Sequence, residues 1–299
     1  MKTIDLLEEL ESKICPEKFY NYAQILNREY NFSLNDHQLW KLIHSVFGEE
    51  YKFIFKKYNL LIANEIINKI VMKYYPGEKF IKYNFIKKFI VNKQDIVLFE
   101  MYADSSRVDL CRINGKSIAY EIKTEVDNLT RLSKQIEDYS KLFEYIYIIL
   151  DQRHLFKATE IIPNYVGIIV YKVQCGKFSF CYKRKASKNK NIDSEAQIRN
   201  LSSQDMSKIL KKRSLPIPST KDERAGILKK SFDKKQINFL FKDIIKLKYA
   251  EQWYFIKTNF NEIYPIDIQS FFHNPIDPKL AYYKSTVISQ TLYKYNDSL

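Results

Sequence analysis

Apolar and polar residues alternate in the middle of the chain, a pattern typical of β-strands. One alternating run starts at Ile96 and breaks at residues 103–106. A second run starts at Arg107, and Asn114-Gly115, a strong hairpin signal, separates it from a third that ends at Lys123. Residues 127–143 have a helical pattern, and the apolar run 145–150 is typical of a buried strand. The predicted order is therefore strand, strand, strand, helix, strand.

Helices are predicted on both sides of these strands, and two more strands follow them. Helical spacing of apolar residues and capping signals predict helices at residues 6–14, 19–26, 33–47, 49–74, 78–91, 201–210, 221–230 and 237–249. Residues 166–173 and 178–182 are predicted as strands around a turn at Cys175-Gly176, which gives a sheet of five or six strands. The fold class is α/β, a mixed sheet core flanked by helices, with helical N-terminal and C-terminal additions.

Three charged residues interrupt the apolar pattern of the second and third strands. Asp109 lies between Val108 and Leu110, and Glu121 and Lys123 lie two residues apart, so they share one face of a strand. Burying an unpaired charge is costly, so charges inside a sheet need a reason. Two carboxylates with a lysine beside them are accounted for if a divalent cation binds between the carboxylates.

These residues resemble the PD-(D/E)XK nuclease superfamily, in which an Asp is followed by Glu-x-Lys, a helix and a strand. Here the motif is Asp109 with Glu121-Ile122-Lys123, and the next helix has a Gln135-x-x-x-Tyr139 pair like that of the RecB-like branch. Arg107-Val-Asp109 and the segment Asp127-x-x-x-Arg131-Leu resemble a largely uncharacterised bacterial subgroup. The proline of the motif is replaced by Val108. The resemblance covers residues 78–151 and implies a restriction-endonuclease-like core.

The resemblance also implies a chemistry. Asp109, Glu121 and the backbone carbonyl of Ile122 would bind Mg²⁺ or Mn²⁺, hard cations that prefer oxygen ligands. Lys123 would orient or deprotonate the attacking water or stabilise the phosphate, and Gln135 and Tyr139 would face the site. The expected catalytic residues are Asp109, Glu121, Lys123, Gln135 and Tyr139. The expected activity is that of a Mg²⁺-dependent nuclease that hydrolyses phosphodiester bonds in DNA, in phage defence or DNA repair.

Strand register decides whether the carboxylates meet. A turn centred on Asp104-Ser105 places Glu100 opposite Asp109, which makes Glu100 an additional candidate metal ligand, or an exposed residue paired with an arginine. A two-residue Asn114-Gly115 turn would place Asp109 opposite Tyr120. One more loop residue, or a β-bulge, would place Asp109 opposite Glu121. The proposed site requires this second, irregular arrangement.

Several basic residues are candidate contacts for nucleic acid. Arg131 lies one helical turn before Gln135, where it could bind a phosphate, and Asp127 could cap that helix. Five basic residues fall within residues 183–190, interpreted as a mobile linker or a phosphate-binding segment. Residues 201–232 weakly resemble a SAP-type nucleic-acid-binding motif, with an ordinary helical hairpin as the alternative. The candidates for nucleic-acid binding are Arg107, Arg131, Lys183, Arg184 and Lys185.

Charge and composition narrow the partners. The chain has 49 basic and 35 acidic residues, which favours an anionic partner even though its low glycine content and many Lys and Asn residues indicate an AT-rich genome. No apolar run is long enough for a membrane span, and the N-terminus has no signal-peptide pattern, so a cytoplasmic protein is expected. Cys15, Cys111, Cys175 and Cys181 lack zinc-site spacing and are expected to be reduced and mostly buried.

The expected domains are a helical region at 1–77, a nuclease-like core at 78–183, and a C-terminal region at 184–299 that starts with the basic linker. Two other functions stay open: a non-catalytic nucleic-acid-binding protein on a nuclease scaffold, and an effector that cleaves RNA or tRNA. The sequence also leaves open a partner protein, a homodimer, the substrate structure and the direction of cleavage.

Overall fold

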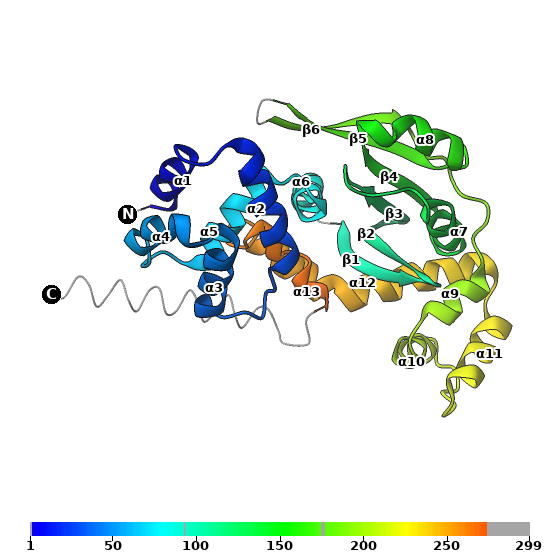
Figure 1. Cartoon of the computed structure of the whole chain (residues 1–299). Coiled ribbons are helices and arrows are strands. Elements are labelled where there is room, and N and C mark those ends of the chain that lie inside the picture. Colours follow the sequence, from blue (N-terminus) through cyan, green and yellow to red (C-terminus); the bar gives the residue numbers. More distant parts are fainter. Residues whose placement is uncertain (1, 93, 175–176, 274–299) are drawn as a thin grey trace. The chain divides into compact units, whose positions relative to one another are not determined.

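A six-stranded mixed sheet organises one of the two units into which the chain divides (Figure 1). The computed structural model describes residues 2–92, 94–174 and 177–273. One unit comprises residues 85–258, and the other comprises residues 1–84 and 259–299. The strands are β1 (Ile96–Ala103), β2 (Ser106–Asn114), β3 (Lys116–Lys123), β4 (Tyr145–Asp151), β5 (Gly167–Gln174) and β6 (Lys177–Arg184).

Sheet order follows chain order, from β1 to β6. The pairs β1–β2, β2–β3 and β5–β6 are antiparallel, whereas β3–β4 and β4–β5 are parallel. Helix α7 (Leu132–Leu142) provides the crossover between β3 and β4. The mixed α/β class and the predicted order of three strands, a helix and a strand are confirmed.

Both hairpins have the register that the site requires. Phe99 pairs with Leu110 and Met101 pairs with Val108, so Glu100 lies opposite Asp109. Leu110 pairs with Tyr120 and Asn114 pairs with Lys116, so Gly115 alone forms the tip, with φ at +64°. Asp109 therefore lies opposite Glu121 rather than Tyr120, and the irregular arrangement is confirmed.

Helices cover both faces of the sheet. The second half of α6 (Glu78–Ile90) packs on one face, where the Phe85 and Tyr120 rings meet edge to face at 4.8 Å between centroids. Tyr120 and Glu121 are successive strand residues and point to opposite faces. Tyr139 of α7 contacts Glu121, so α7 lies on the other face. The remaining helical elements of this unit are η2 (Gln152–His154), α8 (Leu155–Ile161), α9 (Ser194–Asn200), α10 (Ser203–Lys212), α11 (Lys221–Ser231) and α12 (Lys234–Thr258).

The segment between β6 and α9 is fixed to the sheet unit, where a mobile linker was expected. The Asn189 side chain is buried and donates hydrogen bonds to the carbonyls of Ser140 and Phe143, at 2.5 and 3.0 Å. Further along, Gln197 donates to Leu142 O at 3.0 Å, and Lys242 of α12 donates to Gly115 O at 2.7 Å. These bonds explain why residues 184–258 belong to the same unit as the sheet.

The other unit is helical. Its elements are α1 (Thr3–Glu11), α2 (Pro16–Glu29), α3 (Asp36–Phe47), η1 (Glu49–Tyr51), α4 (Lys52–Lys57), α5 (Ala63–Tyr74), the first half of α6, η3 (Pro265–Asp267) and α13 (Ser270–His273). The single long helix expected at 49–74 is wrong, because the helix ends at Lys57 and restarts at Ala63, whose N–H donates to Asp36 Oδ1 at 2.8 Å. A buried Asp267 accepts a 2.5 Å hydrogen bond from Tyr30, which attaches η3 to α2.

Two of the three cysteines that the structure describes are exposed. Cys111 is a buried free thiol, but the free thiols of Cys15 and Cys181 are exposed, so their expected burial is wrong, since each lies at an element end or on an edge strand. Cys175 lies outside the described residues. Among the helices that the structure describes, none is both long and apolar enough to cross a bilayer.

Two glycines allow a matched stability test. A Cβ on Gly167 would lie 2.3 Å from the Tyr147 ring and 2.8 Å from the Ala186 backbone nitrogen, whereas a Cβ on Gly226 of α11 meets no described heavy atom within 4 Å. We expect Gly167→Ala to destabilise the protein by about 1–3 kcal/mol through overpacking. Gly226→Ala should stabilise it by about 0.5–1 kcal/mol through helix propensity. Urea unfolding measures both values, and equal effects would contradict the tight packing at Gly167.

Candidate active site

The Glu121 carboxylate is the centre of the candidate site. It is 1% exposed and accepts hydrogen bonds from three side chains. Lys123 Nζ and Gln135 Nε2 each lie 2.6 Å from Glu121 Oε1, and the Tyr139 hydroxyl lies 2.5 Å from Oε2. A buried carboxylate is stable as an anion only when such donors replace water. The structure therefore brings together four of the five expected catalytic residues around one carboxylate.

The crossover helix supplies two of these donors. Gln135 and Tyr139 are four residues apart on α7 and so lie one above the other on the face that meets β3. Burial and the nearby carboxylates of Glu121, Asp109 and Glu100 raise the pKa of the Tyr139 phenol well above its usual value. The phenol therefore stays neutral. Its hydroxyl lies within hydrogen-bond distance of two acceptors, Glu121 Oε2 and the Arg107 carbonyl, which is 2.8 Å away.

Asp109, the fifth expected residue, lies beside Glu121 on the neighbouring strand. Its Oδ2 accepts a 2.6 Å hydrogen bond from the Ile122 backbone N–H, so the carboxyl lies against the Glu121–Ile122 peptide unit. Carboxylate oxygens of Asp109 and Glu100 lie within 4.8 Å of each other. Carboxylates this close repel each other and favour a bound cation. Glu100 and Asp109 offer carboxylate oxygens, the ligands preferred by Mg²⁺, and so fit that ion.

Glu100 adopts a backbone conformation that is unusual within a strand. Its φ is +57°, in the left-handed region, which costs a non-glycine residue about 1–2 kcal/mol. Its side chain is buried and forms a 2.6 Å ion pair with Arg107 Nε. Both readings from the sequence are thus met in part: Glu100 faces Asp109, and it also pairs with an arginine. Backbone strain of this kind tends to persist at functional sites.

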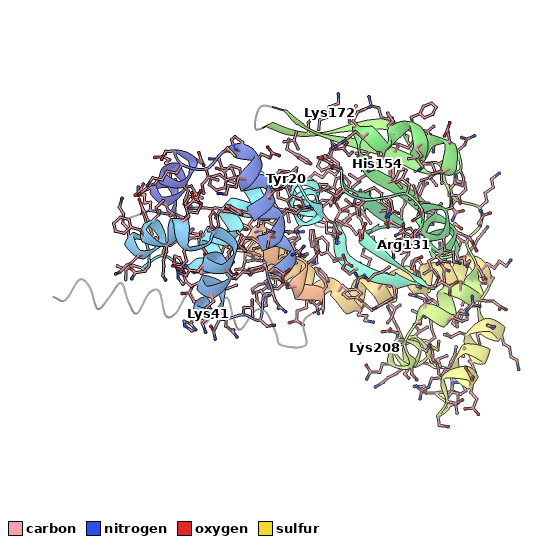
Figure 2. The ribbon with its side chains drawn as sticks, viewed as in Figure 1. Tyr20, Lys41, Arg131, His154, Lys172 and Lys208 are labelled. Atoms are coloured by element: carbon pink, nitrogen blue, oxygen red, sulfur yellow. The ribbon has the colours of Figure 1, made fainter. Side chains whose placement is uncertain are left out.

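The candidate nucleic-acid contacts occupy different positions. Arg131 (labelled in Figure 2) is exposed at the residue before α7. Its carbonyl accepts a hydrogen bond from the Gln135 N–H at 3.0 Å. Arg107 is 57% exposed but paired with Glu100. Lys183 is exposed on β6, and Lys185 is exposed directly after that strand. Arg184 instead donates to the carbonyls of Val166 and Pro163, at 2.7 and 3.1 Å, and so fixes the loop before β5.

Asp127 does not cap α7. Its Oδ2 accepts hydrogen bonds from the backbone N–H and the hydroxyl of Thr124, at 2.7 and 2.6 Å, and the helix begins only at Leu132. A turn forms instead because Asp127 N donates to Thr124 O at 3.2 Å. This turn follows Lys123 directly and stabilises the chain as it leaves β3.

The SAP-like segment has the expected helix, extended link and helix. Capping boxes at Ser202 and Thr220 start α10 and α11. Arg224 holds the link by donating to Pro218 O at 2.7 Å and to Ser219 O at 3.2 Å. The SAP-type motif and an ordinary helical hairpin both have this order of elements.

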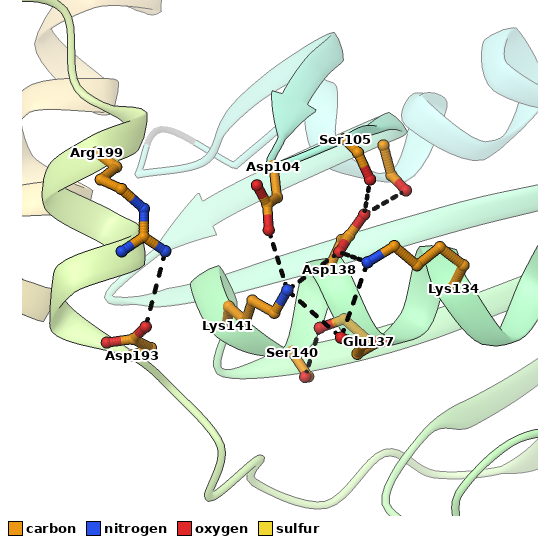
Figure 3. A network of polar contacts seen from close by, with 10 residues as sticks. Asp104, Ser105, Lys134, Glu137, Asp138, Ser140, Lys141, Asp193 and Arg199 are labelled. Carbon is orange, nitrogen blue, oxygen red and sulfur yellow. Dashed lines mark hydrogen bonds and ion pairs between the residues drawn. The ribbon is translucent and has the colours of Figure 1, made fainter.

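Asp138, which sequence reasoning missed, connects α7 to the turn between β1 and β2. Figure 3 shows the Asp138 carboxylate between the hydroxyl of Ser105 and the ammonium groups of Lys134 and Lys141. It accepts hydrogen bonds from Ser105 and Ser106 at 2.7 and 2.8 Å, and it pairs with Lys134 at 2.9 Å. Burial alone would raise the pKa of Asp138, but these donors outweigh it and lower the pKa to about 2. One sequence signal could have revealed Asp138: it directly precedes Tyr139, on a helix face that is buried.

Comparison with known proteins adds a family. The model of a family described as Bacteriophage P4 protein cII matches residues 73–271, more than half of the chain. A solved structure, the SPO1766 protein of unknown function from Silicibacter pomeroyi, is similar at 14% identity with a TM-score of 0.28, over 43% of this chain and 83% of that one. No curated protein sequence matches the chain.

The strain at Glu100 can be measured with two truncations. Glu100→Gly and Glu100→Ala both remove the carboxylate and its ion pair, but only glycine adopts a φ of +57° without steric cost. We expect the glycine variant to be more stable than the alanine variant by about 1 kcal/mol, with thermal or urea unfolding as the measurement. Equal stabilities would show that Glu100 is not strained.

Proposed function

The chain belongs to the family of bacteriophage P4 protein cII, and we propose that it is a metal-dependent nuclease that hydrolyses phosphodiester bonds in DNA. The observation that supports this most strongly is the buried Glu121 carboxylate, bonded to Lys123, Gln135 and Tyr139. These are the motif residues of the PD-(D/E)XK resemblance, and Asp109 lies on the adjacent strand. A protein that needed only a stable fold would place apolar residues at such positions.

The arrangement of elements supports a restriction-endonuclease-like core. Helix α6 precedes a three-stranded antiparallel meander, and α7 crosses over to β4, which is parallel to β3. In this proposal β5 and β6 extend the core sheet. The candidate residues then come from the central strands β2 and β3 and from the crossover helix.

Asp109, Glu121 and the Ile122 carbonyl would hold Mg²⁺ or Mn²⁺, with Glu100 as an additional ligand. When bound, such an ion lowers the pKa of a coordinated water and neutralises charge that develops on the phosphate. The protein supplies the oxygen ligands in advance, because the hairpin register places Asp109 and Glu100 face to face. Arg107, paired with Glu100, balances part of their negative charge.

The other residues would act on the water and the phosphate directly. The Lys123 ammonium is 6% exposed and lies against Glu121, where it can orient a water molecule or stabilise the charged phosphate. Gln135 Oε1 is buried and has no hydrogen-bond partner among the described residues, so it can accept a hydrogen bond from a water at the site. Arg131, exposed one helical turn earlier, is available for a phosphate.

Cleavage by a site variant tests the proposal. We expect purified protein to cleave supercoiled plasmid in Mg²⁺ or Mn²⁺ but not in EDTA, because the carboxylates act through a divalent ion. Asp109→Asn keeps the shape of the side chain, removes its charge and should lower the rate at least about 100-fold. Glu160→Gln, an equivalent change at an exposed position of α8, should leave the rate unchanged and serves as the control.

The competing functions predict other results in the same assay. An RNA-cleaving effector would degrade RNA in preference to DNA of equal length and would still lose activity in Asp109→Asn. A non-catalytic nucleic-acid-binding protein would bind the plasmid without cleavage and without any need for divalent ions. Cleavage that is equal in wild type and Asp109→Asn would refute the proposed site.

A further inference from the structure

The β1–β2 turn is attached to α7 by one buried carboxylate, that of Asp138, which the nuclease motif does not include. Asp138 has 0% exposure, although it lies on a surface helix next to an exposed glutamate. Its Oδ2 accepts hydrogen bonds from the hydroxyls of Ser105 and Ser106. Its Oδ1 accepts hydrogen bonds from the ammonium groups of Lys134 and Lys141, at 2.9 and 3.3 Å. Lys141 also reaches the turn itself, through Asp104 at 3.0 Å (Figure 3).

The turn leads directly into the candidate site. Ser106 is followed by Arg107, whose carbonyl lies 2.8 Å from the Tyr139 hydroxyl and whose guanidinium pairs with Glu100. Asp109 follows two residues later on the same strand. On the helix, Asp138 lies between Gln135 and Tyr139, the two residues that bind Glu121. The same carboxylate therefore fixes both sides of the site: the strand with Asp109 and the helix with Tyr139.

We propose that Asp138 is a positioning residue, which holds the β1–β2 turn against α7 and so sets the distance between Tyr139, Glu121 and Asp109. This inference rests on the proposed nuclease function. The partners of Asp138 given above are residues of the turn and of α7, so its effect passes through these two elements. Small displacements of reacting groups are costly, and a shift of about 1 Å can lower a rate about 100-fold.

Three variants separate positioning from general stability. Asp138→Asn keeps the shape of the side chain but removes its charge. The new amide nitrogen cannot accept a hydrogen bond from a serine hydroxyl. Ser105→Ala with Ser106→Ala removes the same two hydrogen bonds from the exposed turn, where failure to fold is not expected. Glu137→Gln is the matched control, because Glu137 is 62% exposed and pairs with the same two lysines, at 3.8 and 3.5 Å.

Two readouts test the proposal in the full-length protein. For plasmid cleavage in Mg²⁺, we expect Asp138→Asn and the double serine variant to lower kcat about 10- to 100-fold, with KM for DNA within about twofold of wild type. For amide hydrogen exchange, we expect residues 104–107 to exchange about tenfold faster in both variants, without change in α12. Glu137→Gln should change neither quantity.

The two readouts fail differently. If wild type does not cleave nucleic acid, the nuclease proposal fails, whereas exchange at residues 104–107 still tests the attachment. Wild-type kcat in both variants of an active enzyme, or wild-type exchange of the turn, would overturn the role of Asp138. A loss that appears in KM alone would also overturn it, because the residue would then act on DNA binding rather than on the geometry of the reacting groups.

Discussion

A buried carboxylate inside a sheet must receive hydrogen bonds from elsewhere in the fold, and Glu121 is such a residue. Its donors come from two elements, Lys123 from the same strand and Gln135 and Tyr139 from α7. Removing one partner from a buried charged group leaves a desolvated charge, which costs several kcal/mol. The packing of the crossover helix and the hydrogen bonding of Glu121 therefore depend on each other. A shift of the helix along the sheet would remove Gln135 and Tyr139, two of the three donors to Glu121.

The strands around Glu121 contain two backbone irregularities that serve the same purpose. The one-residue tip at Gly115 gives the register in which Asp109 lies opposite Glu121. The left-handed conformation of Glu100 occurs within β1, directly opposite Asp109. A regular hairpin would place Tyr120 opposite Asp109 and keep the acidic residues apart. Strain at a non-glycine residue such as Glu100 tends to persist at functional sites, and here it lies directly opposite Asp109.

The core of the fold could be predicted from the sequence because its signals are local. Period-two alternation and Asn114-Gly115 define the hairpins, whereas the irregular register was required by the nuclease resemblance and did not follow from the turn residues. Features that depend on distant partners could not be predicted. The break before Ala63 depends on the Asp36 side chain of another helix, and the buried Asn189 anchors a segment whose lysines suggested a free linker. Asp127 has the sequence of a helix cap but bonds to Thr124 instead.

Calorimetric titration of Mn²⁺ tests the central claim most directly, namely that the acidic residues around Glu121 form a divalent metal site. The account predicts saturable binding to the wild-type protein, at least about tenfold weaker binding to a variant in which Asp109 is replaced by asparagine, and wild-type affinity in Glu160→Gln. Binding that is absent from the wild type, or that is unchanged by the loss of the Asp109 charge, would contradict it. The remaining explanation would then be that these carboxylates only support the fold.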